Sequence, residues 1–351
     1  MLINAAGLDT RPPEEVVKGM FPRVGAGFAW GPSYWGKSLV FDSELALAVA
    51  NGEPFFGCKV IQGSVALCLG EGLYDAGVRK EARIRRQLAD DQAHRAALAE
   101  LEDDDAAAEW WDDRHPYTDE RLFIETEAFV LPVDARGGVS PSMREALDGL
   151  GRIPDLELVV LDSLANFTGG ASLSHDASAN RIMLGLHLMV AELQCCVLAI
   201  SHPTAKGDKM LGALRLFNAA DFVYQVIPVR GSPGGSGQMV AAVTCQKNKY
   251  GPPPAPVQYV IEPIEWTAPA TDENGNVLDG EPDVTVRSAT VRPWQPKTAS
   301  ALRLPEPGIS GQPENAGRLR VAAAVPARPP KRTGLSPAAA RGGATFALQG
   351  M

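Results

Sequence analysis

The sequence has little of the chemistry that builds metal centres or disulfide frameworks. Its 351 residues include only five cysteines and five histidines. The cysteines form no CxxC pair and show no His–Cys spacing typical of a metal site. An odd number of cysteines, scattered through apolar stretches, indicates reduced and buried thiols in a cytosol-like compartment.

Long hydrophobic runs and an excess of positive charge are also lacking. The apolar runs fall far short of the roughly 20 residues that a membrane-spanning helix needs, and the first residues do not follow the pattern of a signal peptide. We therefore expect a soluble, cytoplasmic protein without membrane contact. The 33 basic and 42 acidic residues give a net charge of −9. This charge excludes coating of nucleic acid by bulk charge, but it leaves room for contacts through a few local basic groups.

Hydrophobic residues make up 45% of the chain, which is enough for a core and excludes a wholly disordered protein. Much of the glycine and proline lies towards the end of the chain, where the hydrophobic periodicity disappears after about residue 265. We expect an N-terminal extension over residues 1–15, one ordered domain over residues 16–265, and a disordered, flexible tail over residues 266–351. This tail is rich in Pro, Gly and Ala and is basic towards its end.

Within the ordered domain, apolar strand-like runs alternate with segments of helical periodicity. The expected strands cover residues 24–30, 64–69, 121–125, 156–161, 196–200, 222–229 and 240–245. The expected helices cover residues 38–52, about 75–111 and 179–193. Strands that are apolar on both faces indicate an α/β fold with a mainly parallel central sheet flanked by helices. Polar side chains follow three of these strands, and open α/β sheets bind ligands at such strand ends.

A phosphate-binding loop is predicted at residues 31–38, where GPSYWGKS fits the pattern G-x-x-x-x-G-K-[ST] between a strand and a helix. Backbone amides of such a loop surround phosphates at a helix N-terminus. Lys37 is then expected to reach the β- and γ-phosphates of ATP, and the Ser38 hydroxyl to bind Mg²⁺. The alternative is a chance turn with a surface lysine, which both flanks make the weaker interpretation. The expected nucleotide-binding residues are Gly31, Pro32, Ser33, Tyr34, Trp35, Gly36, Lys37, Ser38 and Leu39.

Two aromatic residues, Tyr34 and Trp35, occupy places in this loop that small residues commonly fill. The loop binds phosphate through backbone amides, so the aromatic side chains do not prevent binding. They can stack on the nucleotide, pack on a neighbouring subunit or cover apolar surface, and we favour packing.

Three strand ends supply candidates for the metal and the chemistry. Asp162 suits the second Mg²⁺ contact, although a lone Asp after a strand often caps a helix or forms a turn. Glu71 is the best candidate to orient water towards the γ-phosphate, against an exposed turn glutamate as the alternative. His202 is expected to sense the γ-phosphate, with a structural histidine as a serious rival.

Together these residues resemble the RecA-like P-loop ATPases, and among them the plasmid RepA-type and DnaB-type hexameric helicases and phage RecA-like ATPases. The resemblance spans about residues 16–262. It is based on VVKGMFPRVGAGFAWGPSYWGKS, on the strand that ends at Glu71, and on LELVVLDSLANFTGG with SHDASANRIM. It continues through VLAISHPTAKG, GALRLFNAADFVYQV and CQKNKYGPP.

In that family, basic residues at the position of Lys247 and Lys249 reach the γ-phosphate bound by the neighbouring subunit, in the role of an arginine finger. The resemblance therefore implies a homo-oligomer, a hexameric ring or a filament, with ATP between subunits. The alternative for both residues is a pair of solvated lysines beside a turn. Lysine offers a point charge rather than a bidentate fork, which leaves open fast hydrolysis or a slower timing switch.

The family's DNA-contacting loops correspond to about residues 169–177 and 204–214. Basic residues at the second loop are Lys206, Lys209 and Arg215, which several subunits together would turn into a basic channel. Neither loop holds an aromatic side chain for base stacking. The resemblance implies an ATP-driven motor on single-stranded DNA in replication or recombination. The alternatives are a non-motor recombination or annealing factor that uses ATP as an assembly switch, and a regulatory ATPase with a protein partner.

Overall fold

The computed structural model describes residues 12–99, 120–207, 209–212, 214–229, 239–270, 277–278 and 282–294. The acidic run expected around residues 100–113, the glycine-rich hairpin at residues 231–237 and most of the predicted tail lie outside the described residues. Within the described part of the chain, no helix is long and apolar enough to cross a membrane.

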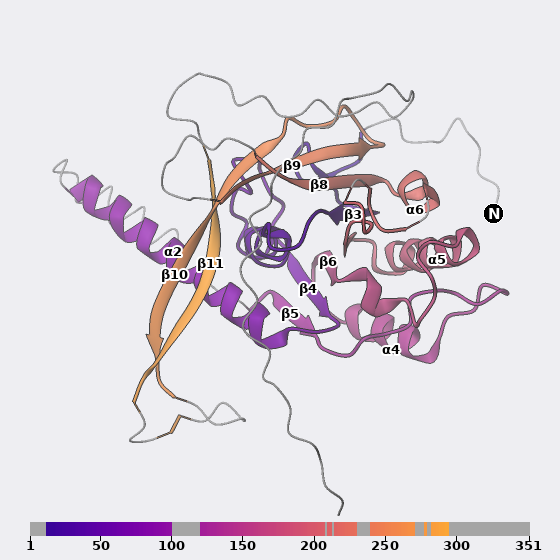
Figure 1. The fold of residues 1–351 in the computed structure, drawn as a ribbon, viewed down its shortest axis with the longest axis horizontal. Coiled ribbons are helices and arrows are strands. Elements are labelled where there is room, and N and C mark those ends of the chain that lie inside the picture. Colours follow the sequence, from indigo (N-terminus) through magenta and orange to yellow (C-terminus); the bar gives the residue numbers. More distant parts are fainter. Residues whose placement is uncertain are drawn as a thin grey trace, which may run out of the picture. The chain divides into compact units, whose positions relative to one another are not determined.

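One nine-stranded sheet forms the centre of the fold (Figure 1). Six neighbouring strands, from β5 to β8, run parallel, and the last three continue the sheet in antiparallel order. In spatial order the strands are β11 (Val284–Pro293), β10 (Val257–Ala268), β9 (Met239–Asn248), β8 (Phe222–Pro228), β3 (Gly25–Trp30), β7 (Cys196–Ser201), β6 (Leu156–Asp162), β4 (Ser64–Leu69) and β5 (Leu122–Glu125). A separate antiparallel pair consists of β1 (Glu15–Val17) and β2 (Phe21–Pro22).

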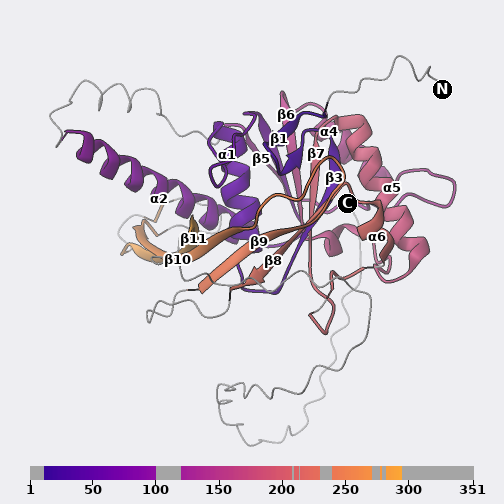
Figure 2. The ribbon, with the colours of Figure 1, turned by 90° about the horizontal axis from the view of Figure 1, so that it is seen from above.

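Helices cover both faces of the parallel strands (Figure 2). On one side lie a π-helical segment, η2 (Leu39–Leu45), its continuation α1 (Ala46–Asn51) and the long α2 (Leu73–Ala99). On the other side lie α4 (Pro141–Leu150), a short 3₁₀ segment η3 (Leu164–Phe167), α5 (Asp176–Leu193) and α6 (Leu214–Ala219). This mainly parallel sheet flanked by helices confirms the expected RecA-like α/β fold class.

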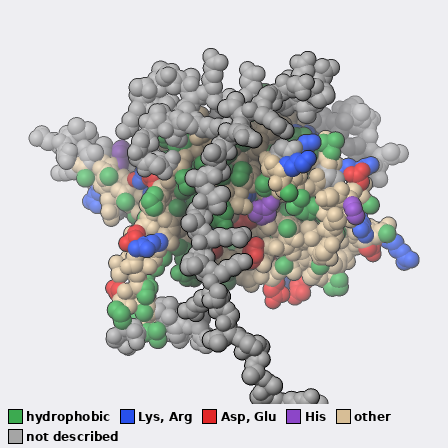
Figure 3. Space-filling view, viewed as in Figure 1, with side chains coloured by type: hydrophobic (Ala, Val, Ile, Leu, Met, Phe, Trp, Pro, Cys, Tyr) green, Lys and Arg blue, Asp and Glu red, His purple; other side chains and the backbone are tan. Residues whose placement is uncertain are grey.

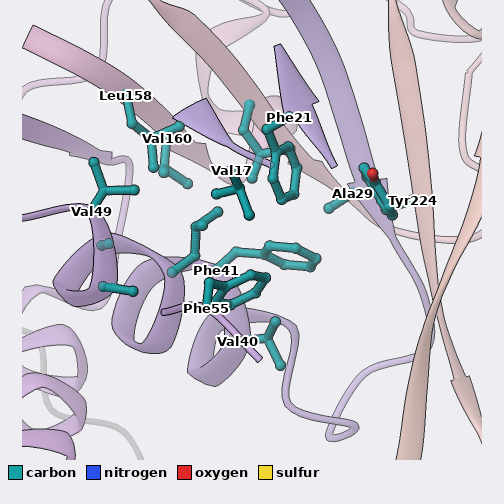
Figure 4. Packing of buried hydrophobic residues seen from close by; sticks show 14 of the residues in the cluster. Val17, Phe21, Ala29, Val40, Phe41, Val49, Phe55, Leu158, Val160 and Tyr224 are labelled. Atoms are coloured by element: carbon teal, nitrogen blue, oxygen red, sulfur yellow. The ribbon is translucent and has the colours of Figure 1, made fainter. Parts of the chain in front are cut away.

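Each face of the sheet buries its own hydrophobic cluster. On the face shown in Figure 4, Phe41 and Val49 of the η2–α1 segment face Leu158 and Val160 of β6. All four side chains are fully buried. Because the strands contribute apolar residues to both faces, their sequences are continuous hydrophobic runs rather than alternating ones.

The expected strands appear with ends within three residues of those predicted, and the three expected helices appear as η2–α1, α2 and α5. Helix α4 was not expected from the sequence, although Ser140 caps it by accepting from the Met143 amide, 3.0 Å away, and Pro141 follows at its first turn.

The boundary expected at residue 265 falls inside β10, and β11 lies beyond it in the same sheet. The start of the flexible tail at residue 266 is therefore corrected. Proline and glycine around these strands indicated a linker, but the β-branched residues of VTVRSATVRP pair with β10 along their whole length.

Candidate functional site

The strand register brings the sequence-predicted residues to one edge of the sheet. Trp30, the residue before the loop, pairs with Ser201 of β7, and Leu69 of β4 pairs with Asp162 of β6. Strand β7 lies between β3 and β6. The loop, His202, Asp162 and the segment that carries Glu71 therefore begin at the carboxyl ends of four neighbouring parallel strands, where open α/β sheets bind ligands.

Two glycines of the loop are required by close packing against the antiparallel strands and their neighbour β8. A Cβ atom on Gly31 would lie 2.5 Å from the carbonyl oxygen of Val226, which is closer than side-chain atoms approach. Gly36 has φ +77°, a left-handed conformation that favours glycine, and its Cβ would lie 3.1 Å from Ile261. The glycine spacing of the motif thus has a structural cause in this fold.

Lys37 is buried, and its ammonium group is held inside the loop. Its Nζ donates to the carbonyl oxygens of Gly31 and Pro32, both at 2.9 Å. Burial lowers the pKa of Lys37, and the nearby carboxylate of Asp162 opposes that shift. The lysine is therefore poised at the loop, where a phosphate would replace the two carbonyl oxygens as its partner.

Ser38 and Asp162 meet as the motif predicts, because the Ser38 hydroxyl donates to Asp162 Oδ2 at 2.7 Å. A hydroxyl and a carboxylate are hard oxygen donors of the kind that Mg²⁺ prefers. Among the described residues, no cluster of three or more His, Cys, Asp or Glu side chains is arranged to hold a metal by itself. The donor set fits Mg²⁺ held by few protein ligands together with nucleotide phosphates.

The two loop aromatics differ in their surroundings. Trp35 packs against the hydrophobic cluster under the loop, and its carbonyl oxygen accepts a 2.6 Å hydrogen bond from the buried Tyr259 hydroxyl. Tyr34 has φ +69° and is 93% exposed. The structure therefore gives Trp35 a packing role within the chain, whereas the Tyr34 ring has no cover in the described part of the chain.

Asp42, which sequence reasoning missed, lies next to Asp162. It is 3% exposed, and the side chains of Asp42 and Asp162 are within hydrogen-bond reach of each other. Burial raises the pKa of Asp42 well above its usual range, and Asp162 adds to the shift. Arg79 of α2 opposes it through an ion pair, Nη2 to Oδ2, at 3.3 Å.

A signal for this contact is present in the sequence. Asp42 and Glu44 interrupt an otherwise apolar helical run, and Arg79, Arg83 and Arg86 recur at intervals that share one helix face. Sequence periodicity places charged residues on the solvent side of a helix. The two charged faces instead cover each other, and only the tertiary contact reveals it.

Glu71 and His202 are both exposed side chains at strand ends. Glu71 lies between β4 and α2, two residues after Leu69, which pairs with Asp162. The carbonyl oxygen of His202 accepts from the Leu211 amide at 2.7 Å, which anchors the loop after β7. Their positions suit the expected roles towards the γ-phosphate, which stay predictions.

Lys247 and Lys249 bind groups at the end of α6 in the same chain. Lys247 Nζ donates to the carbonyl oxygens of Phe217 and Asn218, at 3.0 and 2.6 Å. Lys249 Nζ forms a 2.9 Å ion pair with Asp221. Cations at a helix C-terminus interact favourably with its free carbonyls. A role towards a neighbouring subunit therefore requires these contacts to be exchanged.

Of the three basic residues predicted to contact DNA, two have exposed side chains on the loop after β7, namely Lys206 and Lys209. Arg215 lies in the first turn of α6 and pairs with Asp176 at 3.3 Å, so part of its charge is neutralised. On the described part of the face in Figure 3, basic side chains lie scattered among acidic ones. The site for DNA is thus the least developed of the predicted sites.

Comparison with known proteins places this geometry in a family. The family model described as "AAA domain" matches residues 3–208, which include the phosphate loop, Glu71, Asp162 and His202. A solved structure whose title describes an ATPase domain is similar with a TM-score of 0.44 and 15% identity, over 68% of this chain and 81% of that chain. Curated proteins gave no match. Since the family match covers more than half of the chain, and the loop, the lysine and the Ser38–Asp162 pair are assembled as its chemistry requires, the chain belongs to the AAA domain family of P-loop ATPases.

Proposed function

We propose that this ATPase works as a Mg²⁺-dependent oligomer on single-stranded DNA, as a helicase-like motor in replication or recombination. The observation that carries the ATPase part is the preformed pair of Lys37 and Ser38, one beside each end of the phosphate site. Lys37 is held by loop carbonyls, and Ser38 is hydrogen-bonded to Asp162. This arrangement positions a cation and a metal ligand before the nucleotide arrives, which is how phosphoryl transfer is catalysed.

Exposed aromatic residues beside the nucleotide site support the oligomer. Tyr34 is 93% exposed in the loop, and Tyr74 is 76% exposed just after Glu71. Large apolar side chains exposed next to a site are favourable places for a second protein surface. A second copy that covers them would bring its own Lys247 and Lys249 towards the γ-phosphate in the finger role. Glu71 would then orient the attacking water from within the chain.

Action on single-stranded DNA rests on the exposed Lys206 and Lys209 in the loop after β7. In an oligomer these lysines recur once per subunit, so a weak local charge becomes a basic ring or track. Because the loop begins at His202, close to the phosphate site, nucleotide state and DNA affinity can be coupled through it.

The test is the ATPase rate and the assembly state, measured by light scattering, with and without single-stranded DNA. We expect DNA to stimulate hydrolysis and the double variant K206E/K209E to abolish that stimulation while the DNA-independent rate persists. The matched control is Lys18→Glu, an exposed lysine on the turn between β1 and β2. This control should respond to DNA like the wild type.

Unwinding of a forked duplex separates a motor from the alternatives. A protein that assembles on DNA with ATP but unwinds nothing is the non-motor recombination or annealing factor. If single-stranded DNA changes neither the hydrolysis rate nor the assembly, both DNA functions are wrong, and a regulatory ATPase with a protein partner is the function that remains.

A further inference from the structure

A buried charged contact joins the phosphate-loop helix to α2 outside the residues assigned to ATP chemistry. Three arginines on one face of α2 meet carboxylates of the η2 segment and the turn after α1. Arg83 pairs with Glu44 and Glu53, both at 2.8 Å, and Arg86 pairs with Glu44 at 3.2 Å. The first arginine of the row, Arg79, has a different partner, because it meets Asp42.

The contact between Arg79 and Asp42 has two parts. The guanidinium group pairs with the Asp42 carboxylate at 3.3 Å, and the carbonyl oxygen of Arg79 accepts a 3.2 Å hydrogen bond from the Ser43 hydroxyl. The Asp42 side chain is only 2% exposed, and that of Arg79 is 20% exposed. Side chain and backbone of one residue of α2 thus grip two consecutive residues of η2.

Asp42 in turn contacts the metal-site carboxylate. Ser38 and Asp42 belong to the same helical segment, and both side chains approach Asp162 of β6. Ser38 and Asp42 therefore restrict the rotation of the Asp162 side chain between them. Arg79 holds Asp42 from the other side, and α2 begins two residues after Glu71.

We propose that Asp42 and Arg79 are a positioning pair, which fixes the Asp162 side chain for the Mg²⁺ of the bound nucleotide and connects it to the helix that follows Glu71. The inference rests on the proposed Mg²⁺-dependent ATPase function. Groups that orient a metal ligand typically change metal affinity by about 10–100-fold when they are removed. The other two arginines of the row pair with Glu44 instead and serve to hold α2 against η2.

The test compares Arg79→Met with Arg83→Met, its matched control on the same face of α2. Both variants keep the aliphatic part of the side chain and break a buried ion pair between the same two helical segments. The readout is binding of a fluorescent ADP analogue to the full chain, titrated with Mg²⁺ and repeated in a metal chelator. ATP hydrolysis at varied Mg²⁺ and thermal melting are measured alongside.

We expect R79M to raise the Mg²⁺ concentration for half-maximal binding by about tenfold or more, with metal-free binding of the analogue close to that of the wild type. Asp42→Asn should act in the same direction. R83M should melt earlier than the wild type but keep its Mg²⁺ dependence. If R79M or R83M does not fold, Arg79→Lys and Arg83→Lys give the same comparison with the charge retained, and R79K should show a smaller shift.

Equal effects of R79M and R83M on the Mg²⁺ dependence, or equal loss of metal-free and metal-bound affinity in R79M, would show that Arg79 only stabilises the fold and would overturn the inference. A wild-type protein that binds the analogue but hydrolyses no ATP would overturn the proposed function while the metal titration still tests the pair. A wild-type protein that binds neither nucleotide nor metal would overturn both.

Discussion

The hydroxyl group of Tyr259, on antiparallel strand β10, donates a 2.6 Å hydrogen bond to the carbonyl oxygen of Trp35, inside the phosphate loop. Tyr259 is fully buried and stacks on Phe56 with ring centroids 6.1 Å apart. The loop is therefore supported from below by a strand 224 residues away in sequence. The part of the sheet beyond the parallel strands thus contributes to the shape of the nucleotide site.

Replacing Tyr259 with Phe removes this hydrogen bond and leaves the Trp35 carbonyl without its partner. We expect the free energy of unfolding to fall by about 1–2 kcal/mol and nucleotide affinity to weaken several-fold, because the loop loses a fixed point. Chemical denaturation and nucleotide titration measure the two effects. Tyr224→Phe is the matched control, since the buried Tyr224 hydroxyl donates to the Met20 carbonyl at 2.7 Å, away from the loop. If both variants bind nucleotide equally well, Tyr259 does not support the loop conformation.

Replacing Lys37 with Ala removes the cation that the motif places at the β- and γ-phosphates. We expect ATP hydrolysis to fall below detection and ATP affinity to fall markedly, because the charge developing on the phosphoryl group loses its partner. Lys18→Ala, which removes an exposed lysine paired with Glu15, should leave both quantities unchanged. An unaltered rate in K37A would remove the phosphate loop from the reaction.

Mixing two inactive variants tests the role of Lys249 between subunits. Lys249→Ala lacks the predicted finger and Glu71→Gln lacks the predicted water-orienting carboxylate. If the two residues act on the same nucleotide from different subunits, mixed oligomers contain some interfaces with both intact groups. The ATP hydrolysis rate should then recover partly at intermediate mixing ratios. No recovery at any ratio, with mixed assembly verified by light scattering, would leave Lys249 with its contact to Asp221 alone.

A stability prediction concerns the ion pair of Arg23 and Glu157, at the amino ends of β3 and β6 and away from the phosphate loop. Arg23 Nε and Nη2 both donate to Glu157, at 2.8 and 2.6 Å, and the Glu157 side chain is only 6% exposed. Arg23→Met leaves a buried carboxylate without its partner, so the free energy of unfolding should fall by about 1–3 kcal/mol. Arg144→Met breaks an exposed pair with Glu192 and should cost less than about 1 kcal/mol. Denaturant titrations of both variants check the ranking, which equal losses would contradict.

Much of the fold follows from local sequence. The continuous apolar run LELVVLD is long enough for one strand, its central residues offer no polar position to face water, and a turn follows it. Such a run fits a buried parallel strand wherever it lies in the sheet. The phosphate loop is local for the same reason, since glycine spacing, lysine and serine all lie within eight residues.

The order of the strands and the partners of the charged side chains are not local. Whether Lys247 is solvated or bound to the end of α6 depends on the pairing of β8 with β9, which brings together residues 30 positions apart. The continuation of the sheet through β11 was concealed because a two-strand pairing is decided by its partner rather than by composition.

The amino-acid sequence by itself determined the α/β alternation, the phosphate loop and the expectation that Ser38 and Asp162 share a metal, because each depends on short-range patterns and on the parallel-sheet rule. Only the tertiary structure decided that Tyr259 supports the loop and that Asp42 lies buried between Asp162 and Arg79. Burial is a property of what covers a residue, and α2 and β10 come from distant parts of the chain. A charged residue in an apolar helix can therefore be assigned to solvent or to a site only when its cover is known.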